Sequence, residues 1–210
     1  MDILRRLTGA SDTTCEHIPA ERAAPSGARC EECGSTFNLR LFATCGHVGC
    51  CESQAGHARA ALLARLAALE PPTRRPDVAL VEWLDPLFAP GHWVPEQIER
   101  AGGESVMGVR GERSRESSWE ALAAADPDVV VLGLCGFDLP RTLDEWSAFE
   151  PPAPLMRTKA WRDGQIWAID GSAYVSRPGP RLVDGVEILA AVLAGRPDPR
   201  ARRLPQANVN

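Results

Sequence analysis

The sequence predicts an α/β protein in which a small zinc-finger domain precedes a Rossmann-like lobe with a mostly parallel sheet flanked by helices. Two observations support this. Most cysteines and histidines lie within residues 15–57, whereas every tryptophan lies between Trp83 and Trp167. Beyond residue 76, apolar strand-like runs alternate with helical runs, a pattern typical of right-handed crossovers and parallel strands. The first segment therefore needs metal or sulfur for its stability, whereas the second can bury an apolar core.

Charge and hydropathy exclude several functions. The net charge of −5 is spread through the chain and leaves no basic stripe, so nucleic acid is not expected as a partner. No run of about 18 apolar residues could span a membrane. Residues 1–10 contain no apolar run of signal-peptide length, so we expect a cytoplasmic protein. In a reducing cytosol, clustered cysteines and histidines favour zinc over disulfides.

One zinc site follows from the spacing of the first segment. Cys30 and Cys33 form a Cys-x2-Cys knuckle, which places two thiolates on one side of a zinc ion. Cys50 and His57 can complete a tetrahedron, and four protein donors leave no open position for catalysis. We therefore expect a structural zinc. Further candidate ligands in the segment are Cys15, His17, Cys45 and His47.

These residues carry a resemblance to a known family. The strings CEH at 15–17, CEEC at 30–33 and TCGHVGCCES at 44–53, followed by His57, resemble the ubiquitin-protease-type (UBP) zinc finger over residues 12–60. The resemblance implies that Cys30, Cys33, Cys50 and His57 form the central zinc site of that family.

The chain also departs from the family pattern. Phe42 and Ala61 stand where the family often has a further cysteine and histidine, and the closing Trp-Cys segment that partners the Cys15/His17 pair is missing. Glu52 stands about where ubiquitin-binding members have an arginine. Ubiquitin is therefore not expected as a partner.

A helix and a hinge follow the finger. Residues 57–70 place leucines at helical spacing, at positions 62, 63, 66 and 69, and the prolines of 71–76 end the helix. The expected domains are the zinc finger at 12–60, the helix and proline-rich hinge at 61–76, and the lobe at 77–200.

The lobe is expected to alternate strands and helices. Strands are predicted at 77–83, 128–134 and 165–170, and helices at 94–101, 118–125, 140–149, 155–162 and 180–194. Ser117 or Ser118 should cap the second of these helices, and Asp126-Pro127 should close it.

Three loops should form a ligand-binding edge, because ligands of open α/β sheets bind beyond the carboxyl ends of the strands. These loops span 82–93, 133–138 and 170–177. Their aromatic residues could form a platform for a large flat ligand, or they could cap the sheet as core. The candidate ligand-binding residues are Trp83, Asp85, His92, Trp93, Cys135, Phe137, Tyr174 and Arg177.

This segment also carries a resemblance. The strings EWLDP at 82–86, GHWVPE at 91–96, AGG at 101–103, DPD at 126–128, CGFD at 135–138, DGSAY at 170–174 and RPGPR at 177–181 resemble cobalamin-binding substrate-binding proteins of ABC transporters, a class that also binds iron chelates. The resemblance covers roughly residues 61–195. It implies two lobes that hold the ligand between them, of which this sequence matches only the carboxyl-terminal one. A single lobe should bind a corrinoid or another metal chelate weakly unless another chain supplies the second surface.

No enzyme is expected. Cys135 and His92 could pair, and Glu82 could act with Asp85, but nothing in the sequence orients a base, and no phosphate loop or dinucleotide fingerprint occurs. Our leading interpretation is a zinc-binding protein whose lobe binds a chelate weakly. The alternative is a protein-interaction module that uses the zinc finger and the open edge of the lobe. A third interpretation is a fusion without a selected activity.

Overall fold

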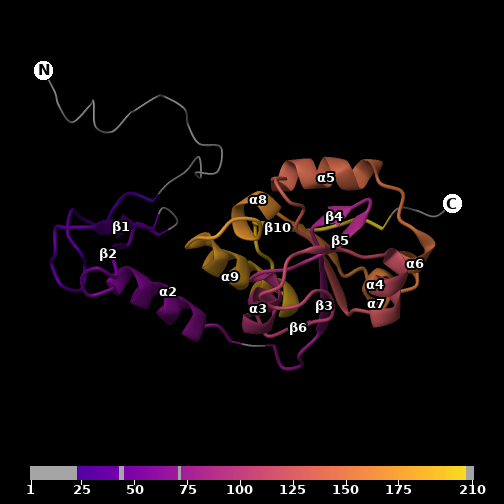
Figure 1. The fold of residues 1–210 in the computed structure, drawn as a ribbon, viewed down its shortest axis with the longest axis horizontal. Coiled ribbons are helices and arrows are strands. Elements are labelled where there is room, and N and C mark those ends of the chain that lie inside the picture. The colour runs from indigo at the N-terminus through magenta and orange to yellow at the C-terminus, as the bar shows by residue number, and fades with distance from the viewer. Residues whose placement is uncertain (1–22, 43–44, 71, 207–210) are drawn as a thin grey trace, which may run out of the picture. The chain divides into compact units, whose positions relative to one another are not determined.

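The computed structural model describes residues 23–42, 45–70 and 72–206, and the chain forms two compact units (Figure 1). The units are Met1–Ala61 and Leu62–Asn210, and each is considered by itself. The expected domain boundaries stay predictions. Among the described residues, no helix combines the length and apolar character needed to cross a membrane.

The first unit is built on a short hairpin. Strands β1 (Leu39–Leu41) and β2 (Val48–Cys50) pair antiparallel, with Leu39 opposite Cys50, and α2 (His57–Ala67) begins seven residues after β2. A side chain at Gly49 would come within 2.6 Å of the backbone nitrogen of Ala58, so glycine lets the start of α2 approach β2 closely. This close approach places the first residue of α2 beside the last residue of β2.

The second unit contains a five-stranded sheet with the order β10-β9-β8-β3-β6. Strands β6, β3, β8 and β9 are parallel, and β10 pairs antiparallel with β9. The α/β fold with a mostly parallel sheet is thus confirmed. The strands are β3 (Asp77–Val81), β6 (Glu104–Ser105), β8 (Val129–Leu132), β9 (Ile166–Ile169) and β10 (Ala201–Arg203).

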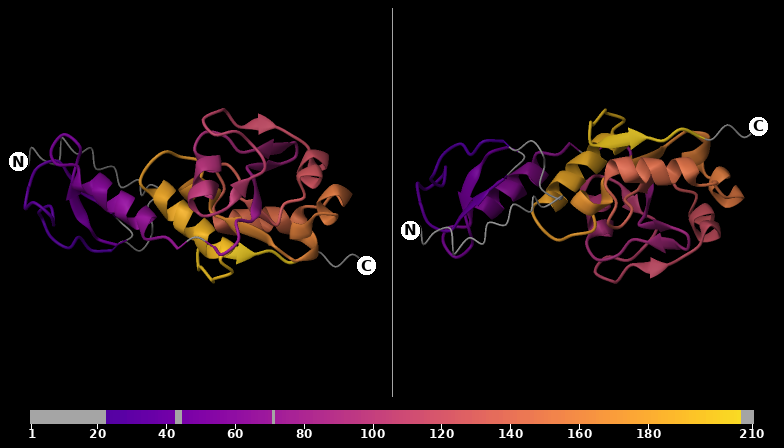
Figure 2. Two further views of the ribbon diagram at one scale, coloured as in Figure 1. Left: turned by 90° about the horizontal axis from the view of Figure 1, so that it is seen from below. Right: turned by 90° about the horizontal axis from the view of Figure 1, so that it is seen from above.

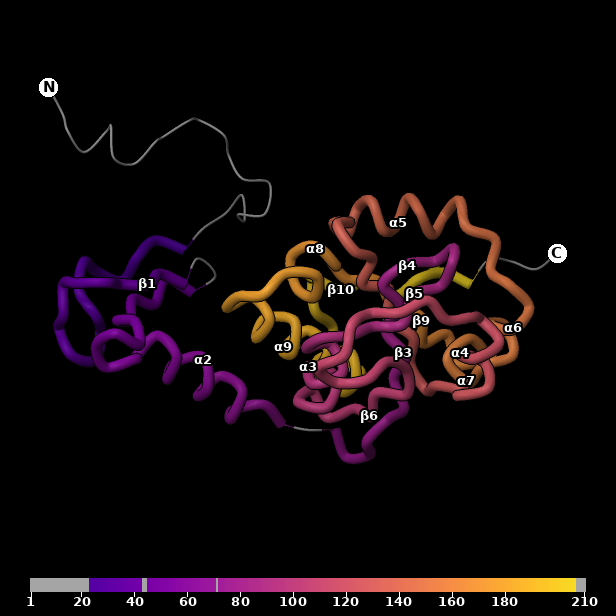
Figure 3. Tube along the Cα trace, in the orientation of Figure 1, coloured from indigo at the N-terminus to yellow at the C-terminus, as the bar shows by residue number. Residues whose placement is uncertain are grey.

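Helices cover both faces of this sheet (Figures 2 and 3). Val78 and Leu80 pack in one cluster with Ile98 and Leu189, and their neighbours along β3 pack in the opposite cluster with Leu122. Because successive residues of a strand point to opposite faces, β3 is apolar throughout. The helices are α3 (Val94–Arg100), α4 (Trp119–Ala125), α5 (Leu139–Ala148), α6 (Ala153–Met156), α7 (Lys159–Arg162), α8 (Gly171–Tyr174) and α9 (Arg181–Leu193).

The caps of α4 illustrate how sequence sets these boundaries. The Ser118 hydroxyl accepts a hydrogen bond from the backbone N–H of Ala121 at 3.1 Å, which satisfies one free donor of the first turn. Asp126 ends the helix with a left-handed φ of 43°, directly before Pro127. The start signal at Ser118 and the stop signal at Asp126-Pro127 therefore act where the sequence predicts them.

A second, three-stranded sheet was not expected. It comprises β4 (Trp83–Leu84), β5 (Leu87–Ala89) and β7 (Arg115–Glu116), in the order β4-β5-β7. Strands of two or three residues are too short to show an alternating pattern in sequence. This small sheet extends from the carboxyl end of β3, where the ligand-binding edge was predicted.

Candidate functional site

Four metal-donor side chains converge in the first unit. Cys30 and Cys33 lie on the turn before β1, Cys50 ends β2, and His57 begins α2. Their donor atoms all lie within 4.8 Å of one another. The sequence-predicted ligands are thus brought together, and the group could hold a metal ion.

The distances in this Cys3His cluster match tetrahedral coordination. The Sγ atoms of Cys33 and Cys50 are 3.9 Å apart, and His57 Nδ1 lies 3.4 Å from the Sγ atoms of both Cys30 and Cys50. Ordinary Zn–S and Zn–N bond lengths in a tetrahedron give S···S of about 3.8 Å and S···N of about 3.6 Å. A disulfide needs sulfur atoms about 2.05 Å apart, so the three thiols are arranged as ligands.

Backbone hydrogen bonds hold the knuckle in place. The Cys30 N–H donates to Ser35 O at 2.7 Å and the Gly34 N–H donates to Cys30 O at 2.8 Å, which closes the turn. The backbone N–H of Glu31 donates to Val48 O at 2.9 Å, and the Glu31 carboxylate accepts from the Val48 N–H at 2.8 Å. The knuckle is therefore fixed to β2, the strand that carries Cys50.

The environment of Cys50 favours its thiolate form. Hydrogen bonds from the backbone N–H groups of His57 and Ala55 lower the pKa of the Cys50 thiol, against an opposing effect of burial. The thiolate is the form that binds metal.

The other four candidate metal ligands lie either outside the described residues or outside the Cys3His cluster. Cys15 and His17 lie outside the described residues. Cys45 is exposed, and His47 lies between two carboxylates, 3.3 Å from Glu31 and 3.2 Å from Glu32. Within the described ranges, the group of converging donors includes neither Cys45 nor His47.

The three predicted loops of the second unit meet at the carboxyl ends of β3, β8 and β9. The Cys135 N–H donates to Glu82 O at 2.9 Å, which joins the first two loops. The Ser172 N–H donates to Phe137 O at 3.0 Å, which joins the second and third. These bonds form because parallel strands end on the same side of a sheet.

A cavity of about 440 Å³ opens at this edge. It is lined by Glu82, Trp83, Pro86, Phe88, Ser114 and Cys135. The Trp83 ring is 39% exposed and packs edge-on against Phe137 at 5.3 Å, while its Nε1 donates to Asp85 O at 3.1 Å. The indole is therefore held in one orientation and offers an apolar surface. We name this site the Trp83 cavity.

Glu82 is the acidic group of the Trp83 cavity. Burial raises the pKa of its carboxyl, although hydrogen bonds from the Ser114 hydroxyl and the Gly91 backbone, together with nearby His92, act in the opposite direction. The Trp83 cavity therefore has one acidic group in a lining that is otherwise mostly apolar.

The predicted aromatic residues do not contribute equally to the edge. Phe137 is 5% exposed and carries the Arg141 guanidinium 3.8 Å above its ring. Trp93 and Tyr174 pack against the cluster that contains Ile98, and Trp93 Nε1 donates to Val175 O at 2.7 Å. Burial also raises the pKa of Tyr174. Phe137 is therefore buried, Trp93 and Tyr174 are half-buried against the core, and Trp83 is exposed.

The remaining candidates lie on the surface of the same loops. Asp85 and Arg177 are exposed. His92 is exposed, has a left-handed φ of 54° and packs against Trp93 with ring centroids 5.6 Å apart. These three side chains therefore lie at the edge but do not line the Trp83 cavity.

Four of the lining residues were not among the candidate ligand-binding residues, namely Glu82, Pro86, Phe88 and Ser114, although Glu82 was considered as a partner of Asp85 in a carboxylate pair. Ser114 reaches the cavity because residues 112–114 pass very close to Gly91, where a side chain would meet the Ser114 nitrogen at 2.2 Å. Gly91, the first residue of the family-like string at 91–96, was the available signal of this close approach.

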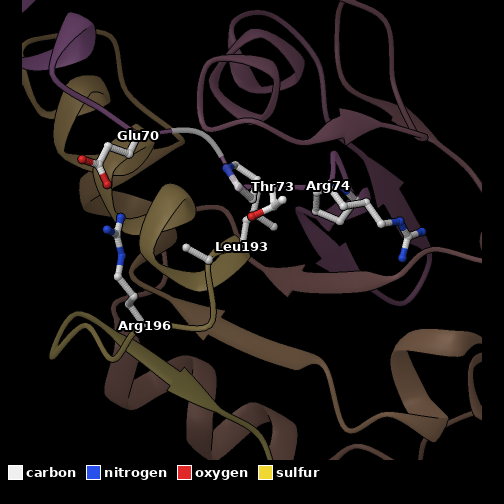
Figure 4. Close-up of a pocket in the computed structure, with 8 residues that line it drawn as sticks. Glu70, Thr73, Arg74, Leu193 and Arg196 are labelled. Atoms are coloured by element: carbon white, nitrogen blue, oxygen red, sulfur yellow. The ribbon is translucent and has the colours of Figure 1, made fainter.

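A second cavity, of about 420 Å³, lies beside residues 70–76, before the start of β3 (Figure 4). Glu70, Arg74 and Arg196 give it mixed charge, and Arg74 already pairs with Asp128 at 2.7 Å. No predicted site residue lines it. Its position away from the carboxyl ends of the strands separates it from the Trp83 cavity.

Comparison with known proteins supports the fold of the lobe. No family model and no curated protein matches the chain. A periplasmic haem-binding protein from Pseudomonas aeruginosa is 26% identical, with a TM-score of 0.50, over 71% of this chain and 54% of that chain. An ABC-type Fe³⁺-hydroxamate transport protein from Saccharomonospora viridis is 24% identical, with a TM-score of 0.51, over 67% and 49% of the two chains. A periplasmic binding protein from Veillonella parvula is 20% identical, with a TM-score of 0.50, over 69% and 50%.

These comparisons correct one expectation. The 26% identical Pseudomonas protein is periplasmic, so the expected cytoplasmic location is wrong. That expectation relied on the absence of an apolar run of signal-peptide length in residues 1–10. The neighbours are binding and transport proteins, which agrees with a lobe that is not an enzyme. The chain spans about half the length of the solved structures that it matches.

Proposed function

We propose that the second unit is a binding lobe for a planar metal chelate, such as a haem or a corrinoid, and that the Trp83 cavity is its contact site. The observation that carries this proposal is the mostly apolar cavity of about 440 Å³ at the carboxyl ends of β3 and β8, where open α/β sheets bind ligands. Its volume falls in the range of small-molecule sites, about 300–1,000 Å³.

The character of the cavity supports a flat, largely apolar ligand. Trp83 and Phe88 supply aromatic surface, and Pro86 extends it. A conjugated macrocycle stacks well on an indole that is held in one orientation. The 26% identical haem-binding protein shares the lobe fold, which supports a chelate over other flat molecules.

The affinity of this chain should be modest when it acts alone. Chelate sites of high affinity bury most of the ligand, whereas an open edge covers one side. A second protein surface over the bound ligand would raise the affinity.

The test is a calorimetric titration of the whole protein with haemin and, separately, with cyanocobalamin. We expect saturable binding of at least one chelate, and a loss of about 10-fold in affinity for Trp83→Ala, since aromatic stacking contributes about 1 kcal/mol or more. Leu63→Ala removes another exposed apolar side chain, on α2, and should bind like the wild type. Equal affinity of the Trp83→Ala variant would overturn the proposed contact site.

We also propose that the first unit is a zinc finger of UBP type with one structural zinc ion. The four donors and their tetrahedral spacing support zinc, and the lack of an open position supports a structural role. The experiment is elemental analysis of protein purified without chelators. One zinc per chain is expected, and a zinc content near zero after reconstitution would overturn this assignment. The predicted protein partner at the open edge stays a prediction.

A further inference from the structure

We propose that the Trp83 cavity binds a positively charged organic group, such as a quaternary ammonium, between its aromatic rings and the Glu82 carboxylate. The proposal rests on the proposed function only in taking this cavity as a binding site. It goes further by naming the charge of the bound group, and it requires neither a metal ion nor a macrocycle.

The small sheet gives the cavity an aromatic surface. Trp83 on β4 and Phe88 on β5 lie directly opposite each other in the antiparallel register, and both line the cavity. Residues that are directly opposite in an antiparallel pair project from the same face of the sheet, with Cβ atoms about 5 Å apart. The faces of aromatic rings carry negative potential, so they attract a cation that lies over them.

Two carboxylates add negative charge to this aromatic surface. Glu82 lines the cavity itself. Glu116 on β7 lies opposite Phe88 in the next strand pair, so its side chain projects from the same face of the small sheet as Phe88 and Trp83. One face of the sheet therefore combines two aromatic rings with a carboxylate, and the cavity adds the second carboxylate.

Glu82 has no cationic partner of its own. In the part of the chain that the structure describes, no arginine or lysine forms an ion pair with its half-buried carboxyl. Burial raises the pKa of this carboxyl, although the Ser114 hydroxyl, the Gly91 backbone and nearby His92 favour the charged form. A partly buried carboxylate gains from a positive charge beside it, and in an open cavity a ligand can supply that charge.

Other kinds of ligand group fit the cavity less well. An anionic group would lie beside the Glu82 carboxylate, and the lining residues include no guanidinium or ammonium group to compensate. A neutral apolar group would take water away from the carboxylate without replacing it by a partner. A cation over the rings of Trp83 and Phe88 satisfies the carboxylate and the aromatic surface together.

The test is a calorimetric titration of the whole protein with choline and, separately, with 3,3-dimethyl-1-butanol, which has the same shape but no charge. We expect choline to bind saturably and at least about 10-fold more tightly than the alcohol, because only the cation is attracted by the rings and the carboxylate.

Three variants locate the site. Glu82→Gln keeps an acceptor for Ser114 but removes the charge, so it should weaken choline binding about 10-fold and leave binding of the alcohol unchanged. Trp83→Leu keeps an apolar side chain without a ring, so it should weaken choline more than the alcohol. Glu120→Gln removes an exposed carboxylate on α4 and is the matched control, which should bind choline like the wild type.

The outcomes separate the two proposals. Equal affinity for choline and the alcohol, or equal affinity of Glu82→Gln and the wild type for choline, would overturn the proposed cation site. If haemin or cyanocobalamin binds but choline does not, the cation site is wrong and the chelate-binding function stands. If choline binds but neither chelate does, the chelate-binding function fails and the cation site stands. If none of the three binds, both fail. Far-ultraviolet circular dichroism of each variant confirms that the fold is retained.

Discussion

Zinc binding by Cys30, Cys33 and Cys50 was expected partly because a cytosol keeps thiols reduced. That premise does not hold for the 26% identical protein, which is periplasmic. The assignment now depends on geometry. Sulfur atoms 3.9 Å apart, with His57 Nδ1 at 3.4 Å from two of them, fit a shared ion and not a disulfide. A bound zinc ion would itself protect these thiols from oxidation, since they would be coordinated thiolates.

Replacing Cys30 with serine should release the zinc and unfold the first unit. Metal binding supplies much of the folding free energy of small zinc domains, and here the buried apolar side chains of the unit are few, among them Phe42 and Val48. Zinc should fall from one per chain to near zero, while the tryptophan fluorescence should stay nearly unchanged, because every tryptophan lies in the second unit. Cys45→Ser should keep its zinc. Loss of the tryptophan signal in Cys30→Ser would show that the two units share a core.

Glu82 should make the stability of the second unit depend on pH. Burial raises the pKa of its carboxyl, so the folded protein holds this proton more tightly than the unfolded chain does. Stability is therefore lost as the pH rises through the folded pKa, and this loss is absent below about pH 4.

Glu82→Gln keeps an acceptor for Ser114 but removes the charge. The variant should match the wild type at pH 4 and exceed its free energy of unfolding at pH 8, as measured by urea unfolding with tryptophan fluorescence. Glu120→Gln, at an exposed carboxyl, controls for the loss of one charge. A Glu82→Gln variant that is less stable than the wild type at pH 8 would show that the carboxylate is favoured by its surroundings.

At the scale of elements, the sequence predicted the longer strands and helices of the lobe well. Strands β3, β8 and β9 are continuous apolar runs, and α4 has recognisable caps, so local chemistry and burial agree. The small sheet β4-β5-β7 escaped prediction because its strands are too short for periodicity and its pairing is set by the close approach at Gly91. The cavity residues contributed by that sheet were missed for the same reason.

An ion-pair network joins α2 to α9 within the second unit. Arg65 donates to both carboxylate oxygens of Glu187, at 2.8 and 2.7 Å, and also contacts Asp184, whose side chain is 3% exposed. Leu66 and Leu69 pack against the core cluster beside it. This end of the helix was predicted from its leucines, but the network was not, because its partners are about 120 residues away in the sequence.

Arg65→Met should therefore destabilise the second unit by about 2–4 kcal/mol, since it leaves a buried carboxylate without its partner. The free energy of unfolding from urea titrations measures this loss. Adding Asp184→Asn should restore part of the stability, because the second change removes the unpaired charge. Arg59→Met, at an exposed position of α2, is the matched control. A cost below about 0.5 kcal/mol for Arg65→Met would place the pair among surface ion pairs of little energetic value.

For the whole molecule, sequence indicated two parts of different chemistry, and the structure shows two compact units. The Cys3His group and the edge loops were found in advance because their residues occur in dense, specific strings. The expected cytoplasmic location was wrong, because it relied on residues 1–10 and not on the strings that resemble binding proteins. The unequal roles of the four edge aromatics also needed the structure, because strand-end aromatics look alike in sequence whether they face core or ligand.

The central claim is that the lobe binds a metal chelate while the first unit holds zinc. Equilibrium dialysis of the zinc-loaded wild-type protein against haemin and against hydroxocobalamin, with zinc, iron and cobalt measured on both sides of the membrane, tests it most directly. We predict one zinc per chain, with iron or cobalt enriched on the protein side in proportion to the protein concentration and approaching one per chain at saturation. Equal iron and cobalt on both sides at chelate concentrations up to about 1 mM, where binding would be worth only about −4 kcal/mol, would contradict the claim.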